Sequence, residues 1–195
     1  VEAGLDDGGR EFAIQLITPT LYQRAEQLSN PLLSGRPPQQ WVEMRRLALS
    51  DLGRITKYDA AFADAHLLMA RLHALPGGTR KAGVESASKA LELYEDAEPK
   101  ANALVARAAL REDANEKIAD LSEAIKVDDD NSAAITARAA VYSQQGNFEK
   151  AAEDFRRVVE LDGDDVLAMA ALAEALAQQE EFGQAIEIAN QAVEK

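Results

Sequence analysis

The chain has 195 residues, which suits one domain with a sizeable core or a short array of repeats. Its formal net charge of −13 disfavours binding to nucleic acid or to an anionic membrane surface. It contains no cysteine, which excludes disulfides and thiolate metal sites, and no apolar run reaches the length needed to span a bilayer.

These properties predict a soluble, cytoplasmic or periplasmic domain. The chain begins at Val1 rather than at Met, and it ends at Lys195, where the last predicted helix would finish. We therefore expect it to be part of a longer protein, and we expect the last repeat to lack a polar capping helix.

The N-terminal part is predicted to be an irregular helical segment over residues 11–62, after a flexible Gly- and Asp-rich terminus at 1–10. Pro19 interrupts the first apolar pattern, which predicts a kink or two short helices, and Thr18 could cap the second of them. Residues 30–38 contain three prolines and are expected to form a loop. A helix is predicted over 40–58, with Trp41 and Ile55 on one face.

Helix pairs are predicted to follow as four repeats, over 63–97, 98–131, 132–165 and 166–195. The predicted helices are 63–75 with 81–94, 99–110 with 116–127, 131–145 with 148–161, and 165–179 with 182–194. In the second repeat, Arg107 precedes its counterpart Arg138 by 31 positions, whereas Leu121 precedes Phe155 by 34. We therefore expect its internal turn to be three residues shorter, balanced by a longer segment around Pro99.

The last two repeats match each other at a fixed offset. Tyr142 and Ala151 correspond to Leu176 and Ala185, since 176 − 142 and 185 − 151 both equal 34. An offset of this size is typical of a solenoid built from helix–turn–helix units. The sequence thus predicts an all-α fold, an α-solenoid of stacked antiparallel helix pairs.

The motif in the third repeat resembles the tetratricopeptide repeat family. It is carried by Ala139, Tyr142, Gly146, Phe148, Ala151, Phe155 and Leu161. Gly163 stands where the family usually has Pro, and Ile135 stands where it often has Trp. The resemblance implies stacked helix pairs with a concave groove, a protein or peptide partner, no cofactor and no enzymatic activity.

The resemblance also implies which residues line the groove, on the first helix of each pair. By alignment they are Asp64, Leu67, Arg71, Ala74, Asn102, Val105, Ala109, Glu112, Ala133, Thr136, Ala140, Ser143, Leu167, Ala170, Glu174 and Ala177. The Lys/Asn/Arg clamp of the family's chaperone-tail binders is not present in this set. A small, mildly apolar lining suits an extended segment or a helix, although these residues could also be the solvated surface of a linker.

Small residues are expected where the paired helices cross, with Ala139 facing Ala151 and Ala173 facing Ala185. Their alternative explanation is the helix propensity of alanine.

Charged residues at equivalent positions of successive repeats predict two ion pairs. Arg138 is expected to pair with Asp154, and Arg107 with Asp120, because both positions become apolar together in the last repeat, as Leu172 and Ile188. Alternatively, these charges lie on unrelated surfaces.

Two further groups of polar residues could suggest a metal site. The acidic runs 128–130 and 162–165 lack the spacing of a calcium loop and are expected to cap helices. His66 and His73 lie seven residues apart on one helix and are expected to be partly buried and neutral rather than metal ligands.

The leading functional hypothesis is a protein-interaction scaffold within a larger, bacterial-style protein. The alternative is a rigid structural spacer, and a remote alternative is an enzyme with an unrecognised site around Trp41, His66, Arg71 and His73. The last helix carries Phe182, Ile186, Ile188 and Val193, which predicts weak self-association through an exposed apolar patch.

Overall fold

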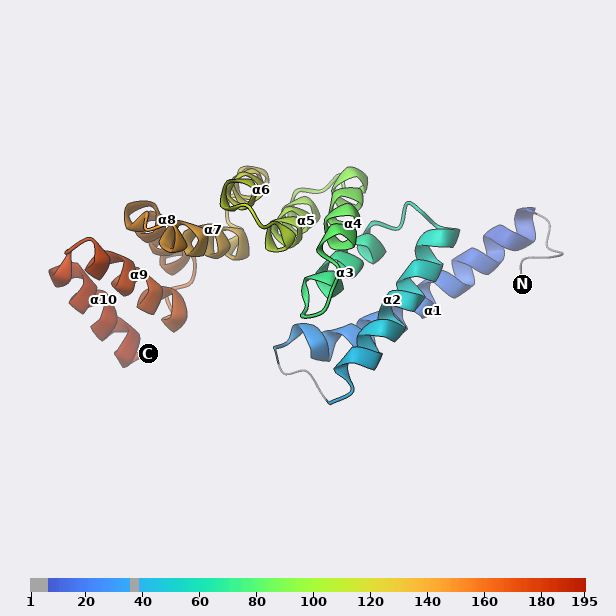
Figure 1. The fold of residues 1–195 in the computed structure, drawn as a ribbon, viewed down its shortest axis with the longest axis horizontal. Helices are drawn as coiled ribbons and strands as arrows, with labels where there is room; N and C mark the ends of the chain where they lie inside the picture. Colours follow the sequence, from blue (N-terminus) through green and yellow to red (C-terminus); the bar gives the residue numbers. More distant parts are fainter. Residues whose placement is uncertain (1–6, 36–38) are drawn as a thin grey trace. The chain divides into compact units, whose positions relative to one another are not determined.

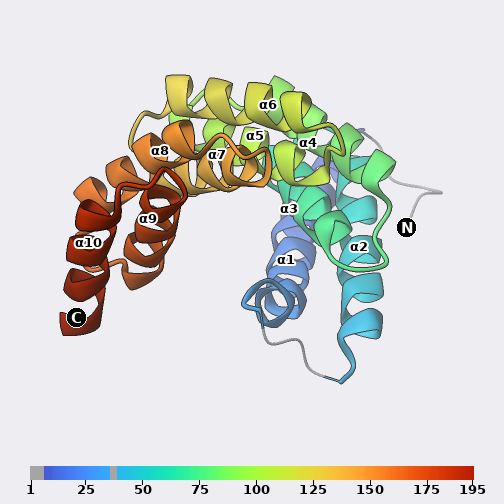
Figure 2. The ribbon, with the colours of Figure 1, turned by 60° about the vertical axis from the view of Figure 1, so that its left-hand side comes forward.

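A computed structural model describes residues 7–35 and 39–195, which form ten α-helices joined by short turns (Figure 1, Figure 2). The chain divides into two compact units, Val1–Glu95 and Asp96–Lys195, each with a core of its own. In both units, consecutive helices pack as antiparallel pairs, and further pairs stack on them. The predicted all-α solenoid class is confirmed.

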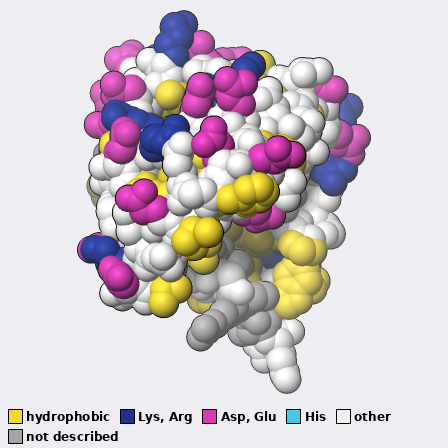
Figure 3. All heavy atoms as spheres, turned by 90° about the vertical axis from the view of Figure 1, so that its left-hand side faces the viewer, with side chains coloured by type: hydrophobic (Ala, Val, Ile, Leu, Met, Phe, Trp, Pro, Cys, Tyr) yellow, Lys and Arg dark blue, Asp and Glu magenta, His cyan; other side chains and the backbone are white. Residues whose placement is uncertain are grey.

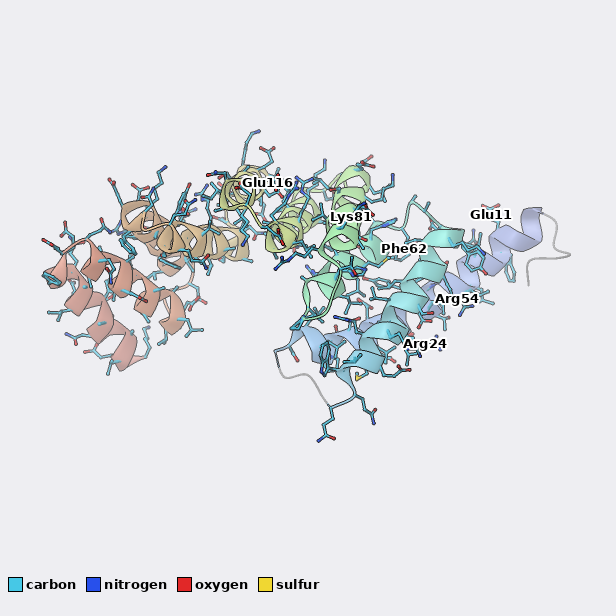
Figure 4. All side chains as sticks on the ribbon, viewed as in Figure 1. Glu11, Arg24, Arg54, Phe62, Lys81 and Glu116 are labelled. Carbon is cyan, nitrogen blue, oxygen red and sulfur yellow. The ribbon has the colours of Figure 1, made fainter. Side chains whose placement is uncertain are left out.

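The first unit contains two helix pairs. They are formed by α1 (Asp7–Leu33) with α2 (Trp41–Tyr58) and by α3 (Ala63–Ala74) with α4 (Arg80–Leu93). The two pairs stack on each other, with both α1 and α2 in contact with α3. Leu52, Ile55 and Leu72 are fully buried between them. Phe62, just before α3, packs its ring 5.1 Å from that of Tyr22 on α1 (Figure 4).

The N-terminal helix differs from the sequence-based prediction. Instead of two short helices meeting at Pro19 and a loop from Asn30, α1 runs for 27 residues with Pro19 and Pro31 inside it. Thr18 does not act as a helix cap, because it lies buried within α1 and its hydroxyl has no partner in the described residues. The helix begins at Asp7, within the terminus predicted to be flexible, and residues 1–6 lie outside the described residues.

Packing explains why α1 continues. A proline in a helix interior costs about 3 kcal/mol. After Pro19, the apolar face of α1 buries Leu21, Ala25 and Leu32 against the rest of the unit, and before it Ile17 packs partly buried against the same core, so that burial stabilises the helix on both sides of Pro19.

The turn between α3 and α4 is held by an arginine from α2. Arg45 donates from Nη1 to the Pro76 carbonyl at 2.6 Å and from Nη2 to the Gly77 carbonyl at 2.9 Å. Gly77 has a φ of +71°, and a Cβ at Gly78 would lie 2.0 Å from the His73 carbonyl oxygen. The predicted Gly77-Gly78 turn is therefore required by backbone geometry.

The second unit contains three helix pairs. They are α5 (Ala97–Leu110) with α6 (Ala114–Val127), α7 (Ser132–Gln144) with α8 (Phe148–Leu161), and α9 (Val166–Gln178) with α10 (Phe182–Glu194). The pairs stack through contacts of α6 with α7 and of α8 with α9. Side-chain oxygens cap four of these helices by accepting backbone N–H bonds, from Asp113, Asn131, Asn147 and Asp165.

The second predicted repeat differs from the third within its first helix, α5, and not within its internal turn. Three residues separate α5 from α6 and α7 from α8 alike, 111–113 and 145–147. Arg107 lies three residues before the end of α5, whereas Arg138 lies six residues before the end of α7 (110 − 107 and 144 − 138). The predicted shorter turn is thus wrong, because α5 loses its last helical turn and instead begins earlier, with Pro99 in its first turn.

The exposed apolar side chains of α10 lie where the sequence predicts a contact surface. Phe182, Ile186 and Val193 are 59 %, 62 % and 86 % exposed, while Ile188 packs against the core. Figure 3 shows hydrophobic side chains reaching the surface among acidic ones. Self-association through this face stays a prediction. Among the described helices, none combines the length and apolarity that a bilayer crossing requires.

The close crossing of α7 and α8 is confirmed at the two alanines that predicted it. Ala139 and Ala151 are both completely inaccessible to solvent, and Ala185, at the same place in the last pair, is 7 % exposed. At such a site a larger side chain must push the helix axes apart.

We expect Ala151→Leu to destabilise the chain by about 1–3 kcal/mol through overpacking, measured by chemical denaturation. Ala189→Leu is the matched control, because Ala189 is exposed on α10 and tolerates the larger side chain. Equal stabilities of the two variants would contradict the close crossing.

Candidate functional site

A pocket of about 360 Å³ lies between α7, α8 and α9 in the second unit. Phe148 and Phe155 of α8 supply aromatic surface, and Ala140 and Ala171 leave the space between the two first helices open. Ser143, Gln144, Glu174 and Ala175 complete the lining. We call this cavity the α7–α9 pocket.

The position of the aromatic surface is set by packing and by one cross-helix hydrogen bond. Phe155 is 6 % exposed and belongs to the core that joins α8 to α9. The Gln179 amide, just after α9, donates to the Phe148 carbonyl at 3.0 Å. Both ends of this part of α8 are therefore tied to the following helix pair.

The polar edge of the pocket is unpaired within the described part of the chain. The side chains of Ser143, Gln144 and Glu174 make no hydrogen bond or ion pair with other described residues. Glu174 is exposed, and no cationic side chain lines the pocket. The arrangement can receive an apolar group on its aromatic surface and a hydrogen-bond donor or positive charge at its edge.

Three of the groove residues expected from the family resemblance, Ala140, Ser143 and Glu174, meet in this pocket. Most of the others are at least partly exposed but do not line it: Asp64, Arg71, Asn102, Val105, Ala109, Thr136, Leu167 and Ala170 on the first helices, and Glu112 in the turn after α5. Leu67 is 8 % exposed and does not line the pocket either. Phe148 and Phe155 were not among the expected residues because they lie on the second helix.

Both predicted arginine–aspartate pairs are present as bidentate contacts. Arg138 donates from Nε and Nη2 to Asp154 at 2.8 and 2.7 Å, and Arg107 donates from the same atoms to Asp120 at 3.0 and 2.6 Å. The hydrogen bond with Asp154 raises the pKa of Arg138 above its ordinary value, although burial opposes the rise. We call this contact between two paired helices the Arg–Asp bracket.

A third Arg–Asp bracket joins α1 to α2. Arg24 donates from Nε to Asp51 at 2.6 Å and from Nη2 to the second carboxylate oxygen (Figure 4). Asp51 is 2 % exposed. Sequence reasoning missed this pair because 27 residues separate its partners, against 13 and 16 in the other two. A buried Asp opposite an Arg on the preceding helix is the signal that could have found it.

Asp64 and Arg71, the predicted groove residues of α3, lie in a polar cluster of the first unit. Tyr94 donates its hydroxyl to Asp64 at 2.5 Å, and burial followed by this bond raises the pKa of Tyr94. Burial, with the charge of Glu26, raises the pKa of Tyr22. Asp64 is thus used internally, whereas Arg71 is exposed and makes no ion pair with described residues.

The remaining candidates serve local structure. His66 Nε2 lies 3.1 Å from the Ala60 carbonyl, and His73 Nδ1 accepts the Thr79 N–H bond at 3.3 Å. Trp41 stacks with Arg45, whose guanidinium is 5.4 Å from the ring centre. The suggested enzyme residues therefore have separate contacts of their own.

The acidic runs take part in helix capping and surface pairing. Asp165 caps α9 by accepting the Ala168 N–H bond at 2.9 Å, and Asp130 pairs with Arg157 at 2.8 Å. No cluster of the described residues has the composition of a metal site.

Sequence comparison finds a family match in the C-terminal part of the chain. Residues 142–195 match the model of the tetratricopeptide repeat family, a span that covers α8 to α10. The resemblance inferred from Tyr142, Phe148 and Ala151 is thereby confirmed. No curated protein sequence matches the chain.

Solved structures extend the similarity of fold to most of the chain. A crystal structure of MamA protein has 16 % identity and a TM-score of 0.70, and the match covers 91 % of each chain. A second MamA structure has 18 % identity and a TM-score of 0.68, and it covers 80 % of this chain and 91 % of that chain. YrrB, described as "a TPR protein with an unusual peptide-binding site", has 17 % identity and a TM-score of 0.63 over 89 % of this chain and 84 % of its own. These matches establish the fold.

The Arg–Asp bracket predicts a strong asymmetry between single and double variants. Asp154→Ile leaves the half-buried Arg138 guanidinium without its carboxylate, and we expect a loss of about 2–3 kcal/mol of unfolding free energy. Arg138→Leu combined with Asp154→Ile copies the last repeat, and we expect it to cost less than the single variant. Chemical denaturation of the two single variants and the double variant measures the coupling. A double variant that costs the sum of both singles would show that the pair is not coupled.

His73 predicts that the chain loses stability in acid. Burial, and then the charge of Arg45, lowers the pKa of His73 below its usual 6.5, and the bond from Thr79 requires an unprotonated Nδ1. Since the unfolded chain binds this proton more readily, the contribution is complete above about pH 6.5 and is lost as the pH falls toward the lowered pKa. Denaturation midpoints across this range should fall less steeply for His73→Gln than for the wild type. His66→Gln is the control, and the same slope in all three proteins would refute the assignment.

Proposed function

We propose that the chain is a protein-interaction module whose α7–α9 pocket receives a side chain of a bound peptide or partner surface. The observation that carries this proposal is the combination of the aromatic surface of Phe148 and Phe155 with an unpaired polar edge at Ser143, Gln144 and Glu174. The volume of the α7–α9 pocket, about 360 Å³, lies within the range of small ligand pockets. This volume suits a large side chain with its neighbouring backbone.

The pocket is built on helices that hold their positions before a ligand arrives. Asn131 and Asn147 cap α7 and α8, and the bracket between Arg138 and Asp154 joins the two helices. A preformed surface loses less conformational entropy on binding than a mobile one. Exposed first-helix residues of the second unit, among them Thr136, Leu167 and Ala170, would extend the contact along the bound segment.

The family supports the class of function, and the solved structures support the fold. Residues 142–195 match tetratricopeptide repeats, and YrrB, with the same fold, is described as having a peptide-binding site. We also propose the repeat division 63–97, 98–131, 132–165 and 166–195, since each span contains one observed helix pair, apart from Ala97, the first residue of α5. The proposed role is binding, with no chemical step.

Selection from a random peptide library displayed on phage tests this function on the full chain. We expect enriched peptides whose affinity falls more than about tenfold in Ala171→Trp, which fills the pocket, because such a loss equals about 1.4 kcal/mol of binding free energy. Glu174→Lys should also weaken peptides that carry a positive charge.

Two matched variants control for effects on folding and net charge. Ala189→Trp adds the same side chain to an exposed alanine of α10, and Glu153→Lys makes the same charge change on the exposed surface of α8. Both should bind as the wild type does. If the enriched peptides bind equally well to Ala171→Trp and Glu174→Lys, the pocket is not the binding site. If no peptide is enriched, the proposal fails and the rigid-spacer alternative is favoured.

A further inference from the structure

A second pocket in the same unit, of about 250 Å³, is lined by α8, α9 and α10 and shares no residue with the α7–α9 pocket. Its apolar lining consists of Val159, Leu172, Leu176 and Ile188. Leu172 and Ile188 stand at the positions where the preceding repeat has its Arg–Asp bracket. We call this cavity the α8–α10 pocket.

The polar edge of the α8–α10 pocket is formed by charged and amide side chains. Arg156, Glu160, Gln184 and Glu187 line it. Arg156 and Glu187 make no hydrogen bond or ion pair with other described residues, while Glu160 lies 3.8 Å from Arg157. The edge therefore carries two carboxylates and one guanidinium.

The same positions one repeat earlier enclose side chains in contact with one another. Subtracting 34 from Leu172, Ile188 and Arg156 gives Arg138, Asp154 and Ser122. Arg138, on α7, binds Asp154 of α8 at 2.7 Å and also donates to the Ser122 hydroxyl of α6 at 3.1 Å. The earlier site is thus closed by the chain's own arginine.

The ring of Tyr142 completes that closed site, and it corresponds to Leu176 in the last repeat. The Arg138 guanidinium lies 6.0 Å from the centre of the Tyr142 ring, and Lys150 Nζ lies 5.3 Å from it. In the last repeat, leucines replace both Arg138 and Tyr142, and the α8–α10 pocket opens at the place that these long side chains would fill.

The two sites also differ in the sign of their charge. The earlier site has three cations, Lys126, Arg138 and Lys150, against the carboxylates Glu153 and Asp154, a net charge of +1. The eight residues of the α8–α10 pocket have one cation, Arg156, against Glu160 and Glu187, a net charge of −1. The α8–α10 pocket therefore lacks the three cations found at the equivalent positions of the preceding repeat, and the chain as a whole is acidic at −13.

We propose that the α8–α10 pocket binds an arginine or lysine side chain from a basic segment of a partner protein. The methylene groups of that side chain lie on Leu172, Leu176 and Ile188, and its charged head meets Glu187 and Glu160. The partner thus supplies in trans the group that Arg138 supplies within the preceding repeat. This site is independent of the proposed peptide pocket and survives if that proposal fails.

Methyl-detected NMR of the full chain tests this site with three small probes, of which the first two have nearly equal shape. They are the Nα-acetyl amides of arginine, of citrulline, which is uncharged, and of norvaline, which has the apolar stem alone. The arginine probe should shift the methyl signals of Leu176 and Ile188 saturably. The citrulline probe should bind about two- to fivefold more weakly, the range that exposed ion pairs provide.

Variants of the pocket separate charge from shape. Glu187→Gln should weaken the arginine probe, and Arg156→Ser, which copies Ser122, should strengthen it because it removes a like charge. Leu172→Arg combined with Ile188→Asp restores the closed site of the preceding repeat and should abolish the shift at Leu176. Glu153→Gln is the matched control, since Glu153 corresponds to Glu187 but lies outside this pocket.

Several results would overturn the proposal. One is the absence of any saturable shift at Leu176 and Ile188. Another is equal affinity for the arginine, citrulline and norvaline probes, which would identify a merely apolar cleft. A third is an Arg156→Ser protein, folded by circular dichroism, that binds the arginine probe no more tightly than the wild type.

Discussion

The second unit depends on how closely the two helices of a pair can approach each other. Ala139 and Ala151 meet at a crossing that excludes water completely, and the Arg138–Asp154 bracket lies on the same two helices. When two helix axes are this close, a side chain between them can adopt few rotamers. A half-buried arginine there must have a carboxylate opposite it. The separation of the helices and the placement of the charge pair are therefore one constraint.

The Arg–Asp bracket of the first unit shows that this contact also forms between helices that do not follow the repeat pattern. Arg24 and Asp51 join α1 to α2 across a connection that no simple repeat offset describes. With Asp51 buried, α1 must present Arg24 at a defined height along α2, and the apolar residues beside Arg24 must face the core. This requirement helps to explain why α1 remains one helix through Pro19, since a break there would displace the face that carries Arg24.

The sequence allowed accurate prediction where two positions recur at one offset and change together. The positions of Arg138 and Asp154 are both apolar in the next repeat, and such joint change indicates contact. It gave no comparable signal for the bond between Tyr94 and Asp64, which lie 30 residues apart in a pair without a close copy. Phe148 and Phe155 were missed for another reason, because the depth of a side chain between helices depends on its neighbours: Ala140 and Ala171 are small enough to leave a pocket beside them.

Departures from the repeat therefore carry more functional information than its conserved positions. Where a copy is complete, as with Arg138, Tyr142 and Asp154, the chain satisfies its own polar groups at that site. Where Leu172, Leu176 and Ile188 replace them, the fold is kept because the core that includes Leu172 and Leu176 stays buried, yet a cavity opens beside it. A repeat protein thus contains its own reference for each site, because comparing two copies shows which chemical group one of them lacks.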